Sequence, residues 1–247
     1  MLDAVEPAGS AAPPAPADHA QPMPVDAAVV EAPVVEAAVV EAAVVEDSAV
    51  HVPHVVDDAG QDLLFRNART RWHWTSEPVG DDVLRQLYDL LKMGPTSGNC
   101  SPARFLFLRT DWSKQRLRPA LSAGNVDKAI AAPVVCIVAH DPKFYEDLPR
   151  LAPGTDARGW YAGNDELANE TAFRNGTLQG AYLMMAARAV GLDCGPMSGF
   201  DNATIDQEFL VAQGWKSNFL VALGHADDEG VAERAPRLTF DEACRLL

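Results

Sequence analysis

The stretch "ELANETAFRNGTLQGAYLMMAARAVGL", residues 166–192, constrains the fold more than any other part of the sequence. It predicts one long helix, and from Ala172 to Val190 its residues are apolar or small nearly all round. A helix with this pattern lies inside a core rather than on a surface. Gly176 and Gly180, four residues apart, allow another part of the chain to approach closely. We therefore expect a long buried core helix against which the other elements pack.

The segments around this helix predict an α+β fold. Helices are expected over residues 62–72 and within 78–95, where an apolar stripe recurs at helical spacing (Val83, Leu84, Leu87, Leu90, Leu91). Strands are expected at 103–110, 132–140 and 216–226, and the continuous apolar run of the second is typical of a buried strand. Short helices are expected near 111–122, 125–132, 206–214 and the C-terminus. This order predicts a small sheet wrapped by helices.

Two segments have no regular period. Residues 191–201, "GLDCGPMSGFD", form a Gly/Pro-rich junction that ends the long helix in a turn. Residues 141–164 contain three prolines and four aromatic residues. Such a segment can cover a binding site or be an ordinary surface excursion, and the sequence leaves both open.

Residues 1–59 form a low-complexity segment rich in Ala, Val, Pro and Glu, with VVE repeated every five residues between 29 and 46. A period of five gives neither a helix nor a strand one consistent apolar face. We expect a disordered acidic tail that acts as a linker, with partner binding or localisation as the alternative. The folded domain is then expected to span residues 60–247.

Charge and cysteine usage exclude several classes of function. Eleven of the fifteen excess negative charges lie within residues 1–61, which contain no Lys or Arg, so the remainder is only mildly acidic. Nucleic acid is not an expected partner, because phosphate binding needs clustered basic residues. Four scattered cysteines without a CxxC pair indicate neither a zinc site nor a disulfide framework. With no signal peptide and no apolar run of membrane-spanning length, we expect a cytoplasmic protein that does not contact membranes.

The sequence lacks self-contained acid–base machinery. His73, His140 and His225, the histidines outside the tail, have no metal-ligand spacing, and GxSxG, HExxH, GxGxxG and P-loop motifs are absent. No metal site and no catalytic side chain are expected. Either the protein is not an enzyme, or a bound cofactor carries the chemistry.

Three features favour an organic phosphate cofactor. Arg69 and Arg237, at opposite ends of the domain, can fork onto a phosphate. The junction "GPTSGNCSP", residues 94–102, offers backbone N–H groups, hydroxyls and an amide, while "GPMSGFD", residues 195–201, allows close approach of the backbone. Within the first junction, Cys100 has no neighbouring base or second thiol and is interpreted as a packing residue.

Together and in this order, these features resemble the nitroreductase family of FMN-dependent reductases. The family's Arg-Ser-x-Arg-x-Phe motif corresponds to residues 69–74, "RTRWHW", and its Pro-Ser-Ser-x-Asn-x-Gln-Pro motif to residues 95–102. Its Pro-x-x-Gly-Phe turn corresponds to residues 196–200, and its C-terminal basic residue to Arg237. The resemblance covers residues 61–247 and implies a nitroreductase-like fold with a small, mostly antiparallel central sheet.

The resemblance also implies a site. The family forms homodimers with two FMN molecules at the interface, and NADPH or NADH supplies the electrons. Arg69, Thr70 and Arg237 are then expected to hold the ribityl phosphate, and Pro95, Thr96, Ser97 and Asn99 to reach the flavin, partly across the dimer. Residues Pro196, Met197, Ser198 and Gly199 are expected along the isoalloxazine, with a backbone N–H near Ser198 close to N5. Two departures stand out: Trp72 replaces the second arginine, and Ser101 replaces the glutamine.

A narrower resemblance concerns the substrate. The stretches "LYDLLKMGPTSGNCSPARF", "PALSAGNVDKAIAAPV", "TAFRNGTLQGAYLMMAARAVGLDCGPMSGFDNA" and "WKSNFL" are similar to malonic semialdehyde reductases, which form 3-hydroxypropionate in uracil degradation, a route of pyrimidine degradation. This implies ping-pong hydride transfer from NAD(P)H through FMN to a small aldehyde acid. Arg158 and Arg104 are candidates for the substrate carboxylate, although Arg104 also fits an ordinary surface charge at a strand end. The alternatives are a broad-acceptor nitroaromatic or quinone reductase and a non-catalytic flavin-binding or interaction protein.

Overall fold

The computed structural model describes residues 55–227 and 229–247. Most of the predicted tail therefore lies outside the described residues, and the predictions about it stay predictions. Within the described residues the first element begins at Asp58, two residues before the predicted domain start at residue 60. The elements in chain order are α1 (Asp58–Gln61), the π-helix η1 (Asp62–Arg66), α2 (Asp81–Leu91), η2 (Ser97–Asn99), β1 (Ala103–Leu108), α3 (Asp111–Gln115), α4 (Ala123–Ala131), β2 (Val134–His140), η3 (Phe144–Asp147), α5 (Leu148–Leu151), η4 (Arg158–Trp160), α6 (Asp165–Ala189), β3 (Asp193–Met197), α7 (Asn202–Ile205), the π-helix η5 (Asp206–Leu210), β4 (Lys216–Gly224) and α8 (Phe240–Ala243).

The sheet is small and antiparallel, as predicted. Its four strands lie in the order β1-β2-β4-β3, and each neighbouring pair is antiparallel. A register irregularity between Val138 and Ala139 interrupts the pairing of β2 with β4. The three predicted strands are confirmed as β1, β2 and β4.

The fourth strand, β3, was predicted to be part of a turn, and that prediction is wrong for residues 193–197. Gly195 and Pro196 normally argue against a strand. Here they are tolerated because β3 pairs with only one neighbouring strand, so Pro196 removes no hydrogen bond from a central ladder. On the other side of β3 the described part of the chain makes an isolated parallel bridge, from Thr70 to Cys194, and no further strand.

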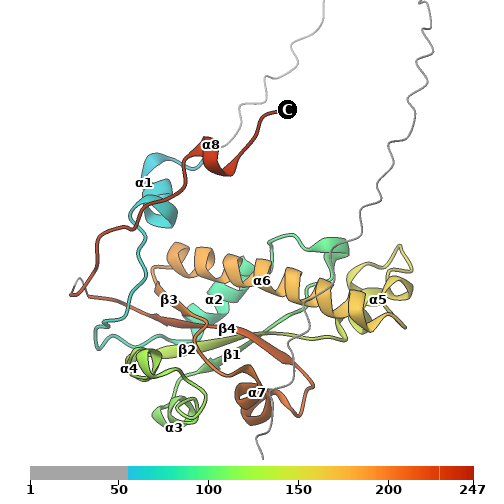
Figure 1. Cartoon of the computed structure of the whole chain (residues 1–247), viewed down its shortest axis with the longest axis horizontal. Helices are drawn as coiled ribbons and strands as arrows, with labels where there is room; N and C mark the ends of the chain where they lie inside the picture. The colour runs from blue at the N-terminus through green and yellow to red at the C-terminus, as the bar shows by residue number, and fades with distance from the viewer. Residues whose placement is uncertain (1–54, 228) are drawn as a thin grey trace, which may run out of the picture. The chain divides into compact units, whose positions relative to one another are not determined.

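Helices cover both faces of the sheet, α2 and α6 on one side and α3, α4 and α7 on the other (Figure 1). Strand β2 shows how the core is divided, because all seven of its residues are buried. Val134, Cys136 and Val138 pack with α2 and α6, while the alternate residues, Val135 and Ile137 among them, pack on the opposite side. This period of two explains why the run is continuously apolar.

The long helix α6 runs over the sheet and packs against α2 and all four strands. Its glycines allow the close approach expected from the sequence. A Cβ atom at Gly180 would lie 2.7 Å from Cε1 of Phe219, and one at Gly176 would lie 3.1 Å from Cβ of His140. Only one stripe of α6 is buried, however, rather than nearly its whole circumference, and side chains outside that stripe, such as Leu178 and Phe173, are exposed. The small residues of α6 suggested that the whole helix surface is buried. In the structure they bring the helix close to the sheet on one side only.

The predicted helix over residues 62–72 is shorter in the structure and ends at Arg66. The guanidinium of Arg234, far along the chain, donates to the carbonyl oxygens of Phe65, Arg66 and Ala68. These last carbonyls would otherwise lack partners, so a distant arginine stabilises the helix end.

Leu90, predicted in the apolar stripe of α2, is 46% exposed, whereas Leu84, Leu87 and Leu91 are buried. Within the described residues no helix combines the length and apolar character needed to cross a membrane.

We predict that Gly180→Ala lowers the free energy of unfolding by about 1–3 kcal/mol, because the new methyl group overpacks the contact with Phe219 and Val138. Gly124→Ala is the matched control, since it lies in α4 with nothing within 4 Å of the added Cβ. That control should gain up to about 1 kcal/mol from reduced backbone freedom. Urea unfolding of both variants measures the difference, and equal stability would show that the close approach is not a constraint.

Candidate functional site

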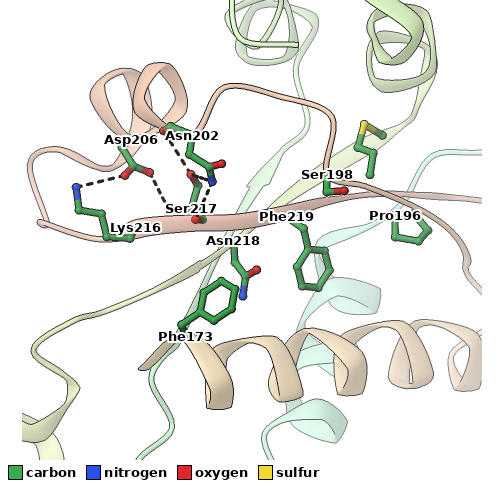
Figure 2. A pocket seen from close by; sticks show the side chains of 10 residues that line it. Phe173, Pro196, Ser198, Asn202, Asp206, Lys216, Ser217, Asn218 and Phe219 are labelled. Carbon is green, nitrogen blue, oxygen red and sulfur yellow. Dashed lines mark hydrogen bonds and ion pairs between the residues drawn. The ribbon is translucent and has the colours of Figure 1, made fainter. Parts of the chain in front are cut away.

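The main candidate site is a cavity of about 840 Å³ at the end of β3 (Figure 2). Its apolar lining comes from Phe173 of α6, Pro196 and Met197 of β3, and Phe219 of β4. Its polar lining comes from Ser198, Asn202, Asp206, Lys216, Ser217 and Asn218. Flat apolar side chains with a few convergent polar groups are typical of a site for an organic ligand. Three of the four residues predicted along the isoalloxazine line this cavity.

Hydrogen bonds fix the polar side of this first cavity. Asp206 accepts the backbone N–H of Ser217 at 2.7 Å and pairs with the ammonium of Lys216 at 3.3 Å. The Asn202 amide donates to the hydroxyl and carbonyl oxygens of Ser217, at 2.9 and 3.0 Å (Figure 2). Asn218 donates to Thr177 of α6 at 2.7 Å. The start of β4 is therefore tied both to α7 with η5 and to α6.

The turn that follows β3 is held by the segment before α4. The carbonyl oxygen of Gly199 accepts from the N–H of Ser122 and from the amide of Asn125, both at 3.0 Å. A Cβ atom on Gly199 would lie 2.6 Å from Nδ2 of Asn125, so a glycine is needed for this approach. The backbone of residues 196–199 is thus presented to the cavity in a fixed position.

Two segments far apart in the sequence contact each other, residues 65–70 and the chain that leads to α8, and Figure 1 shows α1 and α8 close together. Arg69 donates to the carbonyl oxygen of Ala232, and Arg234 donates to the carbonyls at the end of η1. Thr70 bridges to Cys194, two residues before Pro196. Arg237 is exposed, and its guanidinium donates to the carbonyl oxygens of Ala235 and Pro236. The residues predicted for the phosphate therefore lie on adjacent segments.

The loop of residues 95–102 is held by polar side chains of α6. The N–H of Ser97 donates to Asn175 Oδ1, and the N–H of Ala103 donates to Gln179 Oε1, both at 2.9 Å. The hydroxyl of Tyr182 donates to the carbonyl oxygen of Pro95 at 3.1 Å. Asn175 and Gln179 are each only 5% exposed, so these bonds satisfy amides that would be costly to bury alone.

The same loop stores backbone strain. Among the described residues, Asn99 and Ser101 are the non-glycine residues with positive φ, at 54° and 38°, and Gly98 between Ser97 and Asn99 has φ 57°. Side chains hold this shape: Thr96 accepts the N–H of Ser101 at 3.0 Å, and the Asn99 amide donates to the Leu151 carbonyl at 2.8 Å. Strain that is held in place from several sides is typical of functional loops.

This loop does not line the first cavity. Asn99 and Ser101 line a second cavity of about 610 Å³, together with Arg104, Arg150 and Leu151, among other residues. Within one chain, the residues predicted at 95–99 and at 196–199 are therefore not brought together in one pocket. The 141–164 segment, for which the sequence left two alternatives, packs its Phe144 and Tyr161 with Cys100 and borders this second cavity.

The two arginines predicted for a substrate carboxylate are both paired with acids. Arg158 forms a two-fold ion pair with Glu146, with both N···O distances 2.8 Å, and this hydrogen bonding lowers the pKa of Glu146. Arg104 contacts Asp141 at 3.0 Å and Asp147 at 3.3 Å and donates to three backbone carbonyls of residues 101–103. Neither residue lines the first cavity. Arg104 has the contacts of a residue that fixes the start of β1.

Trp72, the first departure from the family motif, has the ammonium group of a lysine above its ring. The ammonium of Lys128, from α4, lies 4.7 Å from the ring centroid. The other departure, Ser101, lies in the strained loop described above.

Cys100 is 1% exposed and burial raises its pKa, so its interpretation as a packing residue is confirmed. Within residues 55–227 and 229–247 no cluster of metal-ligating side chains is present.

Sequence reasoning missed Asn175, Gln179, Lys216 and Arg234. For Asn175 and Gln179 a signal existed, because two amides four residues apart interrupt the buried side of a helix otherwise made of small and apolar residues. For Lys216 and Arg234 no comparable signal exists, since both look like ordinary surface cations until the fold places them.

Comparison with known proteins agrees with this architecture. The Nitroreductase family model matches residues 66–225. A Cupriavidus pinatubonensis protein named as an NADH dehydrogenase/NAD(P)H nitroreductase is 56% identical over 188 residues, 75% of this chain and 96% of the relative. A Burkholderia lata protein with the same description is 54% identical over 191 residues, 77% of this chain and 98% of the relative. A nitroreductase from Exiguobacterium sibiricum, solved in complex with FMN, shares the fold with a TM-score of 0.68 at 20% identity, over 79% of this chain and 99% of that one.

We predict that Asn175→Ala lowers the free energy of unfolding by about 1–3 kcal/mol and speeds amide exchange at Ser97, because it removes the acceptor of that N–H group. Asn169→Ala is the matched control on the exposed side of the same helix and should change stability by less than about 0.5 kcal/mol. Urea unfolding and hydrogen exchange measure both effects. Unchanged exchange at Ser97 in Asn175→Ala would show that α6 does not hold the loop.

Proposed function

The chain belongs to the nitroreductase family, and on that basis we propose that it is an FMN-dependent NAD(P)H oxidoreductase that reduces malonic semialdehyde to 3-hydroxypropionate. The observation that carries the flavin part is the first cavity, where residues 196–198 lie with two aromatic rings and a row of polar groups. Support for the cofactors also comes from the relatives, one solved with FMN and two named for NAD(P)H. Support for the aldehyde acid comes from the narrower resemblance of the sequence.

The chemistry of the first cavity fits an isoalloxazine. Phe173, Pro196 and Phe219 supply apolar surface for the flat ring, and Ser198, Asn202 and Asn218 supply groups that can hydrogen-bond its edges. Gly199 allows Asn125 to approach the backbone where a Cβ would lie 2.6 Å from its Nδ2, and this contact fixes the turn that follows Ser198. The pocket volume of about 840 Å³ lies within the range of roughly 300–1,000 Å³ that is usual for small-molecule sites.

The phosphate of FMN fits the junction of residues 69–70 with the C-terminal segment. The hydroxyl of Thr70 and the guanidinium groups of Arg69 and Arg237 are donors, and Thr70 lies directly beside β3. We propose that Arg69, Thr70 and Arg237 hold the phosphate. Lys128, over the ring of Trp72, provides a further positive charge on the α4 side of this segment.

When bound, FMN supplies hydride transfer between NAD(P)H and an acceptor. The protein's own contribution would be to bind and orient: residues 196–198 would hold the ring in position, and Phe173 and Phe219 would cover part of it. No side chain is proposed as a catalytic acid or base, and a backbone N–H near Ser198 is proposed to assist at N5.

A homodimer is part of this proposal. Asn99 of the 95–102 loop and residues 196–198 line different cavities of one chain, so we propose that a second copy brings this loop to the flavin. Large apolar side chains are exposed on α2 with its C-terminal turn, on α6 and on the C-terminal segment, as an interface would require (Leu90, Met93, Phe173, Leu178, Leu238, Phe240). Their exposure supports the proposal that the chain forms the same kind of homodimer as its family.

A second candidate is a broad-acceptor nitroaromatic or quinone reductase. It is favoured by the description of both curated relatives as NAD(P)H nitroreductases. It uses the same fold, cofactor and cavity, and therefore differs only in the acceptor.

We predict that Arg69→Gln and Arg237→Gln each weaken FMN binding about 10- to 100-fold, the effect of losing a charge-assisted hydrogen bond. Arg245→Gln removes an exposed arginine of the same C-terminal segment that has no proposed cofactor contact, so its FMN affinity should be unchanged. Quenching of FMN fluorescence on binding to the apoprotein measures all three. Equal affinities in the four proteins would argue against this phosphate site.

We predict that the purified protein is yellow, is bleached by NADPH or NADH without oxygen, and has a higher kcat/KM for malonic semialdehyde than for a nitroarene. The visible spectrum, the anaerobic titration and an acceptor comparison test these three steps separately. A higher kcat/KM for the nitroarene would favour the second candidate. Protein that stays colourless after addition of FMN would contradict both, and light scattering of the same preparation tests the dimer.

A further inference from the structure

Lys216 is the sole cation among the residues that line the first cavity. It is the first residue of β4, its side chain is 58% exposed, and its ammonium makes one ion pair, to Asp206 at 3.3 Å (Figure 2). Asp206 is far less exposed, at 16%, and accepts the N–H of Ser217 through its other oxygen. The acid is therefore fixed, whereas the lysine can leave it without disturbing the backbone.

The other side-chain amides around the cavity have fewer N–H groups left for a ligand. The amide of Asn202 is committed to Ser217, and that of Asn218 to Thr177. An ammonium group has three donor hydrogens, so the Asp206 pair leaves Lys216 with donors for a second acceptor. The cations that the sequence suggested, Arg158 and Arg104, are held by Glu146 and by Asp141 with Asp147 and lie outside this lining.

We propose that Lys216 is the specificity-determining residue that binds the carboxylate of a small acid acceptor in the first cavity, with Asp206 as its partner when no acceptor is bound. This inference rests on the proposed function, since it names how the same cavity would select an aldehyde acid over an uncharged acceptor. Asp206 makes the selection sharper. Without Lys216, its carboxylate faces the incoming anion unneutralised and repels it.

The test uses the purified protein loaded with FMN, in whichever oligomeric state it has. Anion binding and turnover are measured separately. In Lys216→Met we expect the Kd of malonate, measured by calorimetry, to rise roughly 10- to 100-fold, as does KM for malonic semialdehyde. The KM for an uncharged quinone and the FMN content should be unchanged. Lys143→Met is the matched control, an exposed lysine outside the cavity lining, and should bind malonate like the unaltered protein.

A double variant makes the role of Asp206 testable. Lys216→Met with Asp206→Asn keeps an oxygen for the Ser217 N–H but removes the negative charge, so malonate binding should partly recover relative to Lys216→Met. A merely structural role of Lys216 would not give this recovery, because the double variant would be no better folded. Unchanged thermal unfolding of Lys216→Met confirms that the comparison is between folded proteins.

Two outcomes overturn the inference. One is malonate binding in Lys216→Met that equals that of the unaltered protein, and the other is an equal loss for malonic semialdehyde and for the quinone. A selective loss in Arg158→Leu without one in Lys216→Met would return the role to Arg158. Failure of the proposed substrate has a different signature. The unaltered protein would then reduce the quinone but not the aldehyde acid, while Lys216-dependent malonate binding would still support the anion site.

Discussion

The close approach of α6 to the sheet is the constraint on which the other features depend. At Gly176 and Gly180 the helix backbone lies so near β2 and β4 that side chains there would meet His140 and Phe219. This proximity fixes the height and rotation of α6 above the sheet. Asn175 and Gln179, each next to one of the glycines, then lie where they can reach the backbone of the 95–103 segment. A small-residue stripe in one helix thereby sets the position of a loop far away in the sequence.

The loop needs this support because its backbone is strained. Two non-glycine residues with positive φ in a span of three cost of order 1–3 kcal/mol each, and they persist only where the surroundings determine them. The buried amides of α6 carry a matching cost, since each must be hydrogen-bonded to be tolerated in a core. The bonds between them satisfy both requirements at once. The two buried amides and the strained loop therefore stabilise each other.

Local patterns predicted most of this fold, and long-range contacts account for what they missed. The apolar run of β2 and the glycine spacing of α6 are local signals, and the structure confirms both. Strand β3 was missed because Gly195 and Pro196 oppose a strand locally, and only its edge position makes them acceptable. The early end of η1 depends on Arg234, and no sequence pattern links residues so far apart. Three residues of the first cavity, Pro196, Met197 and Ser198, lie in a predicted motif, whereas the cation in its lining, Lys216, was not predicted.

The geometry of α6 also separates the two cavities of the chain. Phe173 lines the first cavity and Gln179 the second. Six residues of helix correspond to a rise of about 9 Å and a rotation of about 240°, so the two side chains point in different directions from one rigid rod. A ligand in the first cavity therefore lies on a different side of α6 from the strained loop of the same chain. In the proposed dimer, the loop that contacts this ligand would come from the second copy, whose own α6 holds it in the same strained shape.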